Sequence, residues 1–505
     1  MINSSYDIAI VGSGIAGSIA ALRLSELRPD LSIVMISKGA ITECSSQLAQ
    51  GGIALPCADV EDDLDRHVHD TLVAGNMRSD PKAVREILLA APRLVAYLEG
   101  HGVAFDRTSD DHYHYALEGG HHRPRVIHTS DATGATIMST LHTAIAASHS
   151  ISVREGMRLT AIRRIDADQW QLEIDHSASN RALLVHAHHV ILAMGGSGNA
   201  FGYSSNLPTA IGDAVELARS LRLPVVDLQW MQFHPTVLVS SGTHTSRPLI
   251  TEALRGAGAY LVNNIGERFM ERYDKRGELA PRDVVSSAML QEMEITATDR
   301  VYLDCRHLPT GVLHQQFPGF MDLCSREYFD PSRDLIPVRP GAHYQCGGIE
   351  AGLDGTTSLP GLFAIGECAR TGMHGSNRLA SNSLLEAGVM ALNAAERISG
   401  AASASCAATT EAPSIERLSP SSVKGADLSI NVLLHELKTL LQHAALDDTK
   451  LRYVDAVSEL AAEIEKRLTS ESSDRDTSHD ARTLSAYARV YAESIGSQQG
   501  TVMTV

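Results

Sequence analysis

The chain has 505 residues, 44% of them hydrophobic, and a formal net charge of −17 at neutral pH. This length exceeds what a single hydrophobic core usually serves, so two or three domains are expected, with room to bury a large ligand. The negative charge repels phosphate backbones and anionic membranes, and no basic stretch offers a local exception, so we expect neither a nucleic-acid partner nor a membrane partner.

Cysteine usage and the first residues indicate a cytoplasmic protein. The seven cysteines are odd in number and form no C-x-x-C pair, which favours reduced, packed thiols over a disulfide framework. Cys346 and Cys368 are expected to be small buried residues. The chain starts without a basic segment followed by an apolar stretch, and it has no run of 18 apolar residues.

The first predicted elements form a nucleotide-binding motif. Residues 6–11 (YDIAIV) read as a buried strand, and residues 18–24 begin a helical pattern. Between them stands G-x-G-x-x-G, made by Gly12, Gly14 and Gly17. The first glycine suits a tight turn, the second admits a pyrophosphate, and the third lets helix and strand pack closely.

The next strand ends unlike that of a simple NAD-binding protein. Residues 31–36 form it, and Ser37 and Lys38 follow where an acidic residue normally holds a ribose hydroxyl. NAD binding is therefore disfavoured.

Two later strands also end at glycines. After a β-rich stretch at residues 162–174, residues 187–194 lead to Gly195 and Gly196, and residues 362–365 lead to Gly366 and Glu367. Strand ends of this kind line the ligand crevice of α/β sheets, so a doubly wound domain is predicted.

The segment 366–386 (GECARTGMHGSNRLASNSLLE) is the most informative in the chain. Its glycines allow close backbone approach to a ligand, and Arg378 offers a planar fork of donors suited to a carboxylate. The alternative is a glycine-rich turn with solvated arginines. The glycine motif at the other end of the chain favours the ligand site.

The rest of the chain predicts two further units. Residues from about 230 to 344 read as a domain inserted into the first one. The stretch 401–426 is rich in Ala, Ser, Thr and Pro and is typical of a linker. Apolar spacing of three and four then predicts helices over residues 430–441, 453–468 and 481–494. The polar insert 469–479 is interpreted as an exposed loop.

With these motifs in view, the chain resembles the succinate dehydrogenase and fumarate reductase flavoprotein superfamily, and within it the L-aspartate oxidases, from residue 6 to about residue 398. The matching segments are SSQLAQGGIA (45–54), HTSDATG (128–134), QFHPT (232–236), TEALRG (251–256), APRD (280–283), HYQCGG (343–348) and the 366–386 segment. The resemblance implies an α/β fold. It has a Rossmann-like FAD-binding domain (1–229 and 345–401), an inserted α+β capping domain (230–344) and a C-terminal helical domain (425–505).

The resemblance implies FAD as the cofactor, and it implies the residues that hold it. They are Gly12, Gly14 and Gly17 at the pyrophosphate; Ser37 and Lys38 near the adenosine; Ser45, Gln50, Gly51 and Gly52 around the isoalloxazine; and Asp213, Glu367, Ser383 and Leu384 toward the ribityl chain and ring. Membrane-complex relatives carry a histidine, covalently linked to flavin, five residues before the glutamine that matches Gln50. Ser45 stands there, so the FAD is expected to be noncovalent.

A dicarboxylate site is implied in the same way. Its residues are His234, Thr251, Glu252, Arg282, His343, Arg378 and Ser381, among which Arg282, His234 and His343 are expected to be catalytic. Two arginines and two histidines suit two buried carboxylates. The other histidines, including those at 112–122, are expected at the surface, and that run lacks the further ligands of a metal site.

Glu118 separates the relatives by substrate. Aspartate oxidases have a glutamate ahead of Gly-Gly-His, and its carboxylate can pair with a substrate ammonium that succinate lacks. The alternative is an exposed loop glutamate. The implied reaction moves a hydride from Cα of L-aspartate to flavin N5 and gives iminosuccinate, the first step of NAD synthesis. Oxygen or fumarate would reoxidise the flavin, and quinolinate synthase is a possible partner.

Some positions depart from the family pattern, so other functions stay open. Ala257 replaces a glutamate in Arg-Gly-Glu-Gly, Met194 replaces a threonine in Ala-Thr-Gly-Gly, and residues 493–500 read ESIGSQQG where aspartate oxidases carry Glu-Ser-Arg-Gly. The alternatives are a soluble fumarate reductase or succinate-oxidising flavoprotein, a specialised aspartate oxidase paralogue in another pathway, and a flavin-bound protein without activity.

Overall fold

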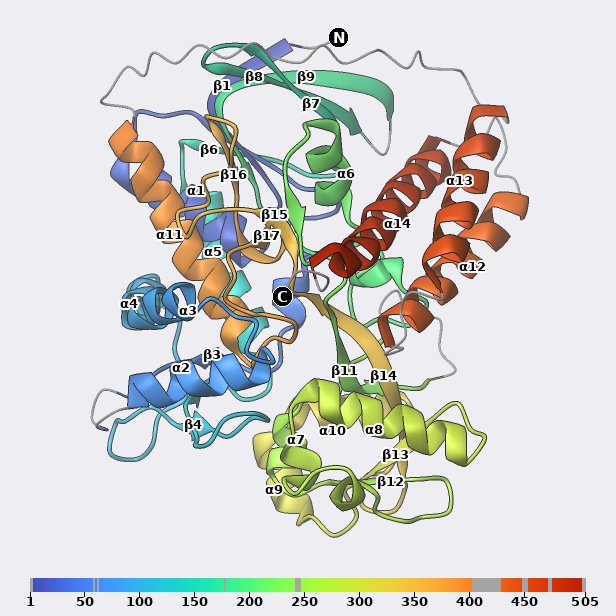
Figure 1. Cartoon of the computed structure of the whole chain (residues 1–505). Helices are drawn as coiled ribbons and strands as arrows, with labels where there is room; N and C mark the ends of the chain where they lie inside the picture. Colours follow the sequence, from blue (N-terminus) through green and yellow to red (C-terminus); the bar gives the residue numbers. More distant parts are fainter. Residues whose placement is uncertain are drawn as a thin grey trace.

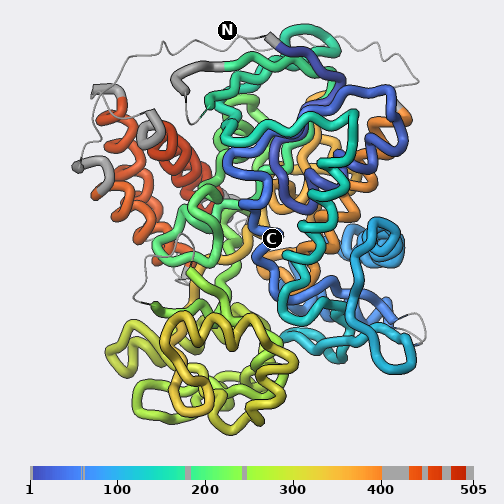
Figure 2. The backbone as a smooth tube through the Cα atoms, turned by 180° about the vertical axis from the view of Figure 1, so that it is seen from behind, coloured from blue at the N-terminus to red at the C-terminus, as the bar shows by residue number. Residues whose placement is uncertain are grey.

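The computed structural model describes residues 3–57, 60, 63–176, 179–240, 247–401, 428–446, 453–470 and 475–501. Figure 1 shows a large α/β unit, a smaller unit at the bottom of the view, and the C-terminal helices at one side. Figure 2 shows from behind that the red C-terminal helices lie along the α/β unit and do not extend away from it.

A seven-stranded sheet forms the centre of the α/β unit, in the order β6-β2-β1-β9-β8-β7 with β16 paired to β9. Its strands are β1 (Asn3–Val11), β2 (Ile33–Ile36), β6 (Ile151–Arg154), β7 (Met157–Asp166), β8 (Gln169–His176), β9 (Ser179–Leu192) and β16 (Leu362–Ala364). The pairs β1/β2, β1/β9, β2/β6 and β9/β16 are parallel. Strands buried on both faces need continuous apolar runs, and β2 (IVMI) is buried throughout.

The α/β unit also contains helices, which pack around this sheet. They are α1 (Ile15–Leu27), α2 (Asp63–Ala74), α3 (Pro81–Leu89), α4 (Ala91–Gly100), α5 (Thr133–Ala147), α6 (Asp213–Ser220) and α11 (Asn382–Ala401). Helix α1 is buried along most of its length and packs against α11 and α5. Two small sheets complete the unit: β3 (Ile53–Ala54), β4 (Tyr115–Ala116) and β5 (Val126–Ile127), and β10 (Val225–Val226), β15 (Gly348–Glu350) and β17 (Ala369–Arg370).

The smaller unit is an antiparallel sheet with its own helices. Its strands run in the order β11 (Met231–Leu238), β14 (Ile336–Gln345), β13 (Val301–Asp304) and β12 (Tyr260–Val262). Its helices are α7 (Ala253–Gly256), α8 (Arg282–Ile295), α9 (Thr310–Gln316) and α10 (Pro318–Arg326). A separate hydrophobic core that includes Phe269, Met289 and Leu303 holds them together. The predicted fold class, an α/β unit with an inserted α+β unit, is confirmed, whereas the exact domain limits stay predictions.

The C-terminal helices are α12 (Leu428–Leu446), α13 (Val454–Ser470) and α14 (Arg475–Thr501). Their core contains Ile464, Tyr487 and Tyr491 and continues into Phe201 and Phe233 of the rest of the chain. Short 3₁₀ helices are η1 (Ser45–Leu48), η2 (Gly198–Ala200), η3 (Met270–Arg272), η4 (Gly277–Leu279) and η5 (Gly366–Cys368). No helix in the described part of the chain is long and apolar enough to cross a membrane.

The expected loop over residues 469–479 is wrong at both ends. Residues 469–470 end α13, and residues 475–479 form the first turn of α14. A polar, charged composition suits a loop and the first turn of a helix equally well, so it does not distinguish the two. Residues 471–474 and the predicted linker at 402–426 lie outside the described residues.

Candidate active site

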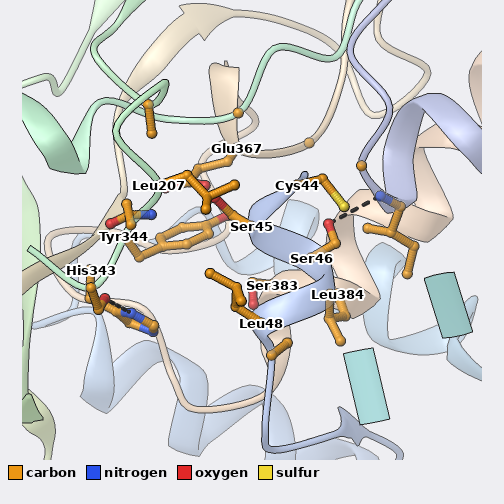
Figure 3. Close-up of a pocket in the computed structure, with 18 of the residues that line it drawn as sticks. Cys44, Ser45, Ser46, Leu48, Leu207, His343, Tyr344, Glu367, Ser383 and Leu384 are labelled. Atoms are coloured by element: carbon orange, nitrogen blue, oxygen red, sulfur yellow. Dashed lines mark hydrogen bonds between the residues drawn. The ribbon is translucent and has the colours of Figure 1, made fainter. Parts of the chain in front are cut away.

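A cavity of about 600 Å³ runs from the carboxyl ends of β1 and β2 to the inserted unit. Every site residue predicted from the sequence lines it, except Gly17. Figure 3 shows part of its wall, where Ser45, Tyr344 and Glu367 come together from distant parts of the chain.

The glycine motif leaves no space for side chains. Gly12 has a φ of +116°, and a Cβ there would lie 2.0 Å from the carbonyl oxygen of Ala193. A Cβ on Gly17 would lie 2.1 Å from the carbonyl oxygen of Gly12, so Gly17 lets α1 approach the loop without touching the cavity itself. At the start of α1, the backbone nitrogen of Ile15 donates to Ser46 Oγ at 3.1 Å. A helix N-terminus with bare backbone around it is suited to a pyrophosphate.

One end of the cavity lies where β2 finishes. Ser37 Oγ is 3.1 Å from Ser13 Oγ, and Lys38 Nζ is 3.0 Å from Asp213 Oδ2. From the sequence, Asp213 is expected toward the ribityl chain and ring, and Lys38 near the adenosine. This split is wrong, because an ion-paired lysine and aspartate occupy the same place. Asp213 belongs with Lys38, since the loop before α6 returns the chain to the end of β2.

Arg158 is a lining residue that sequence reasoning missed. It lies on β7 and its Nη2 atom is 2.7 Å from Asp213 Oδ1. No motif surrounds it, and a lone arginine on an amphipathic strand reads as a solvated residue. Its role is visible only once β7 is placed beside α6.

The middle of the cavity is formed by the segment after η1. Gln50 Nε2 donates to the carbonyl oxygen of Leu249 at 2.9 Å, which joins this segment to the inserted unit. Gly52 N donates to Ser381 Oγ at 3.2 Å. A Cβ on Gly52 would lie 1.9 Å from the carbonyl oxygen of Ile127, so only glycine fits there.

Glu367 follows β16 and faces the same part of the cavity as Ser383 and Leu384. Its Oε1 atom accepts a hydrogen bond from the backbone nitrogen of Gln345 at 3.0 Å. Burial raises the pKa of Glu367 to about 7, although this hydrogen bond acts in the opposite direction. A neutral carboxyl is therefore present there over much of the acidic range.

The other end of the cavity holds a buried group of charges. Arg282 Nε lies 2.7 Å from Glu252 Oε2, and Arg255 Nη2 lies 3.0 Å from Glu252 Oε1. Burial by itself raises the pKa of Glu252, but the two guanidinium groups lower it to about 2. Arg282 also donates to Gln232 Oε1 at 3.1 Å, so its direction is fixed from two sides. Arg255 is buried and was not among the predicted site residues.

Two histidines, His234 and His343, stand beside these charges with ring centroids 5.1 Å apart. Burial and the nearby Arg282 lower the pKa of both well below the usual range, so both rings are neutral at pH 7. His343 Nδ1 lies 2.9 Å from Ser205 Oγ, a contact drawn in Figure 3. His234 Nδ1 accepts from Thr236 N at 3.2 Å, and its Nε2 atom is buried without a hydrogen-bond partner among the described residues. An unpaired donor in a cavity wall suits a polar ligand.

Arg378 is buried and lies with its guanidinium carbon 4.7 Å from the ring centre of Tyr344. Burial and Arg282 lower the pKa of Arg378 to about 10, so it stays cationic at neutral pH. The hydroxyl of Tyr344 is 3.1 Å from His374 Nε2, which in turn lies 2.7 Å from Glu386 Oε2. His374 and Glu386 were not among the predicted site residues, although both are in the 366–386 segment.

Glu118 is only 3% exposed, so the alternative of an exposed loop glutamate is wrong. Its Oε2 atom accepts from Ser381 Oγ at 2.6 Å. Burial and the neighbouring Glu252 raise the pKa of Glu118. Ser381 has a φ of +59°, which is strained for a serine and is typical of functional sites. Thr251 lines the cavity beside Glu252.

The expectation that the remaining histidines are surface residues is partly wrong. His67, His121 and His374 are buried. His121 Nε2 lies 3.0 Å from the carbonyl oxygen of Ala380, and burial lowers its pKa to about 4. The Gly-Gly-His turn folds under the strained Ser381 segment, which the sequence alone does not reveal. In the described residues, no group of three His, Cys, Asp or Glu side chains could hold a metal ion. Cys346 and Cys368 are buried, as predicted.

The sequence of this chain is similar to those of known FAD-binding proteins. The family described as "FAD binding domain" matches residues 7–384. The L-aspartate oxidase of Yersinia pestis is 39% identical over 408 residues, which cover 78% of this chain and 74% of that protein. The L-aspartate oxidase of Neisseria meningitidis is 40% identical over 393 residues, with 78% and 77% covered. This chain belongs to the L-aspartate oxidase family.

Solved structures of other flavoproteins show the same fold. The E. coli quinol fumarate reductase FrdA superposes with a TM-score of 0.83 at 26% identity, over 98% of this chain and 89% of that one. Mycobacterium smegmatis Sdh1 gives a TM-score of 0.79 at 27% identity, over 98% and 87%. As a family member, the chain is an FAD-dependent oxidoreductase.

The cavity fits FAD on its own observations. Gly12 and Gly17 leave bare backbone at the start of α1, where a Cβ would clash. The volume of about 600 Å³ is in the range of small-molecule and cofactor sites. A cation and a carboxylate, Lys38 and Asp213, meet at the end of β2 where the nucleotide end of a dinucleotide is expected.

Proposed function

We propose that this enzyme oxidises L-aspartate to iminosuccinate, as the first step of NAD synthesis. The observation that carries the proposal is a buried glutamate, Glu118, in one cavity with two buried arginines, Arg282 and Arg378. FAD in this cavity would supply the acceptor, at N5, for the hydride from Cα of aspartate, and oxygen or fumarate would reoxidise it.

The two arginines bind the two carboxylates of the substrate. Arg378 is held over Tyr344 but makes only one side-chain hydrogen bond among the described residues, from Nη1 to the carbonyl oxygen of Leu379 at 3.2 Å. Most of its donors are therefore free for a ligand. His234 and His343 are neutral and add hydrogen bonds to the same anions, with Thr251 beside them.

Arg282 orients the substrate and stabilises negative charge. Its partner Glu252 stays ionised, and the ion pair keeps Arg282 in place. Because a guanidinium has five N–H donors, others remain for the substrate. Fixed charges in a water-poor site stabilise a developing charge more than mobile ones do.

Glu118 recognises the amino group. The ammonium group of aspartate can pair with this carboxylate, whereas a dicarboxylate without nitrogen has no cation to offer it. The raised pKa of Glu118 also suits a group that takes a proton from the ammonium, because a neutral amine is needed before the Cα hydride leaves. Ser381 fixes the carboxylate through its 2.6 Å hydrogen bond.

FAD would be held without a covalent bond, because Ser45 stands where membrane-complex relatives have the flavin-linked histidine. The glycine loop would hold the pyrophosphate, Ser37, Lys38 and Asp213 would hold the adenosine end, and Glu367 would face the ribityl side. The residues around the ring would be Gln50, Gly51, Gly52, Ser383 and Leu384. Direct transfer of iminosuccinate to a quinolinate synthase is part of the same proposal.

Glu118→Gln tests the substrate. The KM for L-aspartate should rise by about tenfold or more, because a charge-assisted hydrogen bond to a buried ammonium is lost. The dissociation constant of succinate, followed by the perturbation of flavin absorbance, should change less than about twofold, since succinate has no ammonium to lose.

Anaerobic reduction of the wild-type protein is the matched measurement. L-Aspartate should bleach the flavin absorbance and succinate should not. Bleaching by succinate alone would show a fumarate reductase or succinate-oxidising enzyme instead, whereas an unchanged aspartate KM in the variant would contradict the role of Glu118 in binding the amino group.

A further inference from the structure

Four charged side chains meet at the adenosine end of the cavity, and one of them comes from the C-terminal helices. Lys38, Arg158 and Asp213 line the cavity. Asp480, near the start of α14, lies 2.6 Å from Arg158 Nη1 with its Oδ1 atom. The pairing joins residues 322 positions apart in the chain.

Asp480 balances the charge of this group. Without it, Lys38 and Arg158 share one carboxylate, that of Asp213. The side chains of Asp213 and Arg158 are 11% and 13% exposed, so both depend on protein partners more than on water. With Asp480 present, two cations face two anions.

Helix α14 makes two further contacts that lead to the same place. Tyr487 packs on Gly212, where a Cβ would lie 2.7 Å from the tyrosine ring. Thr483 Oγ1 donates to a carboxylate oxygen of Glu216. Gly212 precedes α6 directly, and Asp213 is the first residue of that helix. Three residues of one helix, Asp480, Thr483 and Tyr487, therefore set the position of Asp213 and Arg158.

The end of β2 explains why this position matters. A dinucleotide site usually has an acidic residue there for a ribose hydroxyl, and this chain has Ser37 and Lys38 instead. Asp213, the first residue of α6, lines this end and contacts Lys38. Among the described residues it is the only carboxylate that does both. Its placement therefore depends on what holds α6 and β7.

We propose that helix α14 completes the adenosine end of the FAD site, and that Asp480 is a positioning residue acting through Arg158 on Asp213 and Lys38. The C-terminal helices thus retain the cofactor in addition to packing on the α/β unit. The inference concerns the cofactor end alone and does not depend on which dicarboxylate is oxidised.

Asp480→Asn tests it in the full-length protein. FAD is removed and the dissociation constant is measured by quenching of flavin fluorescence on adding FAD to the apoprotein. The variant should bind FAD about three- to tenfold more weakly, the range for losing a partly exposed ion pair that orders a binding site. Asp480→Glu, which keeps the charge, should recover most of the affinity.

The control is Glu465→Gln. Glu465 lies on α13 and pairs with Arg489 of α14 at 2.6 Å, away from the cavity, and the substitution changes the net charge by the same amount. It should leave the FAD dissociation constant within about twofold of wild type. Equal effects of the two variants, or no weakening with Asp480→Asn, would overturn the proposal. Aspartate turnover is not part of the readout, so this result stands apart from the test at Glu118.

Discussion

Glu367 lines the cavity and accepts a hydrogen bond from the backbone of β14. Burial raises its pKa to about 7, against an ordinary value of 4.5. Between these two pH values the folded protein keeps the proton while the unfolded chain releases it. The contribution of Glu367 to stability is therefore complete below pH 4.5 and is lost as the pH rises through 7.

Glu367→Gln should remove this pH dependence in the apoprotein. We expect the variant to become progressively more stable than wild type as the pH rises from about 4.5 to about 7, and the difference to level off above it. Urea unfolding at several pH values measures the difference. Glu350→Gln, at an exposed position on β15, is the control variant and is measured in the same way. A difference for Glu367→Gln that does not vary with pH would contradict the assignment.

Single residues differ in how well their patterns can be read from the sequence. Arg282 and Arg378 could be predicted because each stands in a motif with its own chemistry. Glu118 could be selected as well, but its burial could not be predicted, since the covering residues come from the 366–386 segment. Arg158 has no motif, and its partner Asp480 is 322 positions away, so no local pattern indicates either.

At the level of elements, the approach of α1 to the glycine loop sets the shape of the pyrophosphate end. The two backbones come so close that a Cβ on Gly17 would lie 2.1 Å from the carbonyl oxygen of Gly12. A backbone carbonyl cannot rotate away as a flexible side chain does, so α1 would have to move as a whole.

Gly17→Ala should therefore destabilise the protein by about 1–3 kcal/mol and lower the FAD content of the purified protein. Gly100→Ala is the control, because a Cβ at the end of α4 would meet nothing within 4 Å. That change should be neutral or stabilising by up to about 1 kcal/mol. Urea unfolding and the ratio of flavin to protein absorbance give both quantities. Equal stability of the two variants would contradict the packing argument.

Elements were predictable where their periodicity is strong and less so where they are polar. The strand, glycine and helix order at residues 6–24 could be predicted from local signals alone. The start of α14 could not, because helix and loop compositions overlap over residues 475–479. The position of that helix beside α6 is also invisible in the sequence, since it depends on packing between Tyr487 and Gly212.

On the scale of the whole molecule, the inserted unit is attached to the α/β unit by a contact at a helix that lines the cavity. Asp131 Oδ2 accepts from the backbone nitrogen of Phe320 at 3.1 Å, and Asp131 is buried. Phe320 lies in the first turn of α10, so a carboxylate from one unit satisfies a helix N-terminus in the other. Arg326 and Leu323 of the same helix line the cavity.

Asp131→Ala should loosen this attachment while FAD stays bound. We expect the free energy of unfolding to fall by about 0.5–2 kcal/mol, as for the loss of a helix cap. The aspartate KM should rise by about threefold or more, because α10 then no longer holds the cavity wall in place. Asp80→Ala is the matched control: Asp80 caps α3 within the α/β unit by accepting from Lys82 N at 2.9 Å. It should lower stability by a similar amount and leave the KM unchanged. Steady-state kinetics measure the KM, and urea unfolding measures the stability. If the KM rises equally in both variants, general destabilisation and not the contact between the units controls substrate binding.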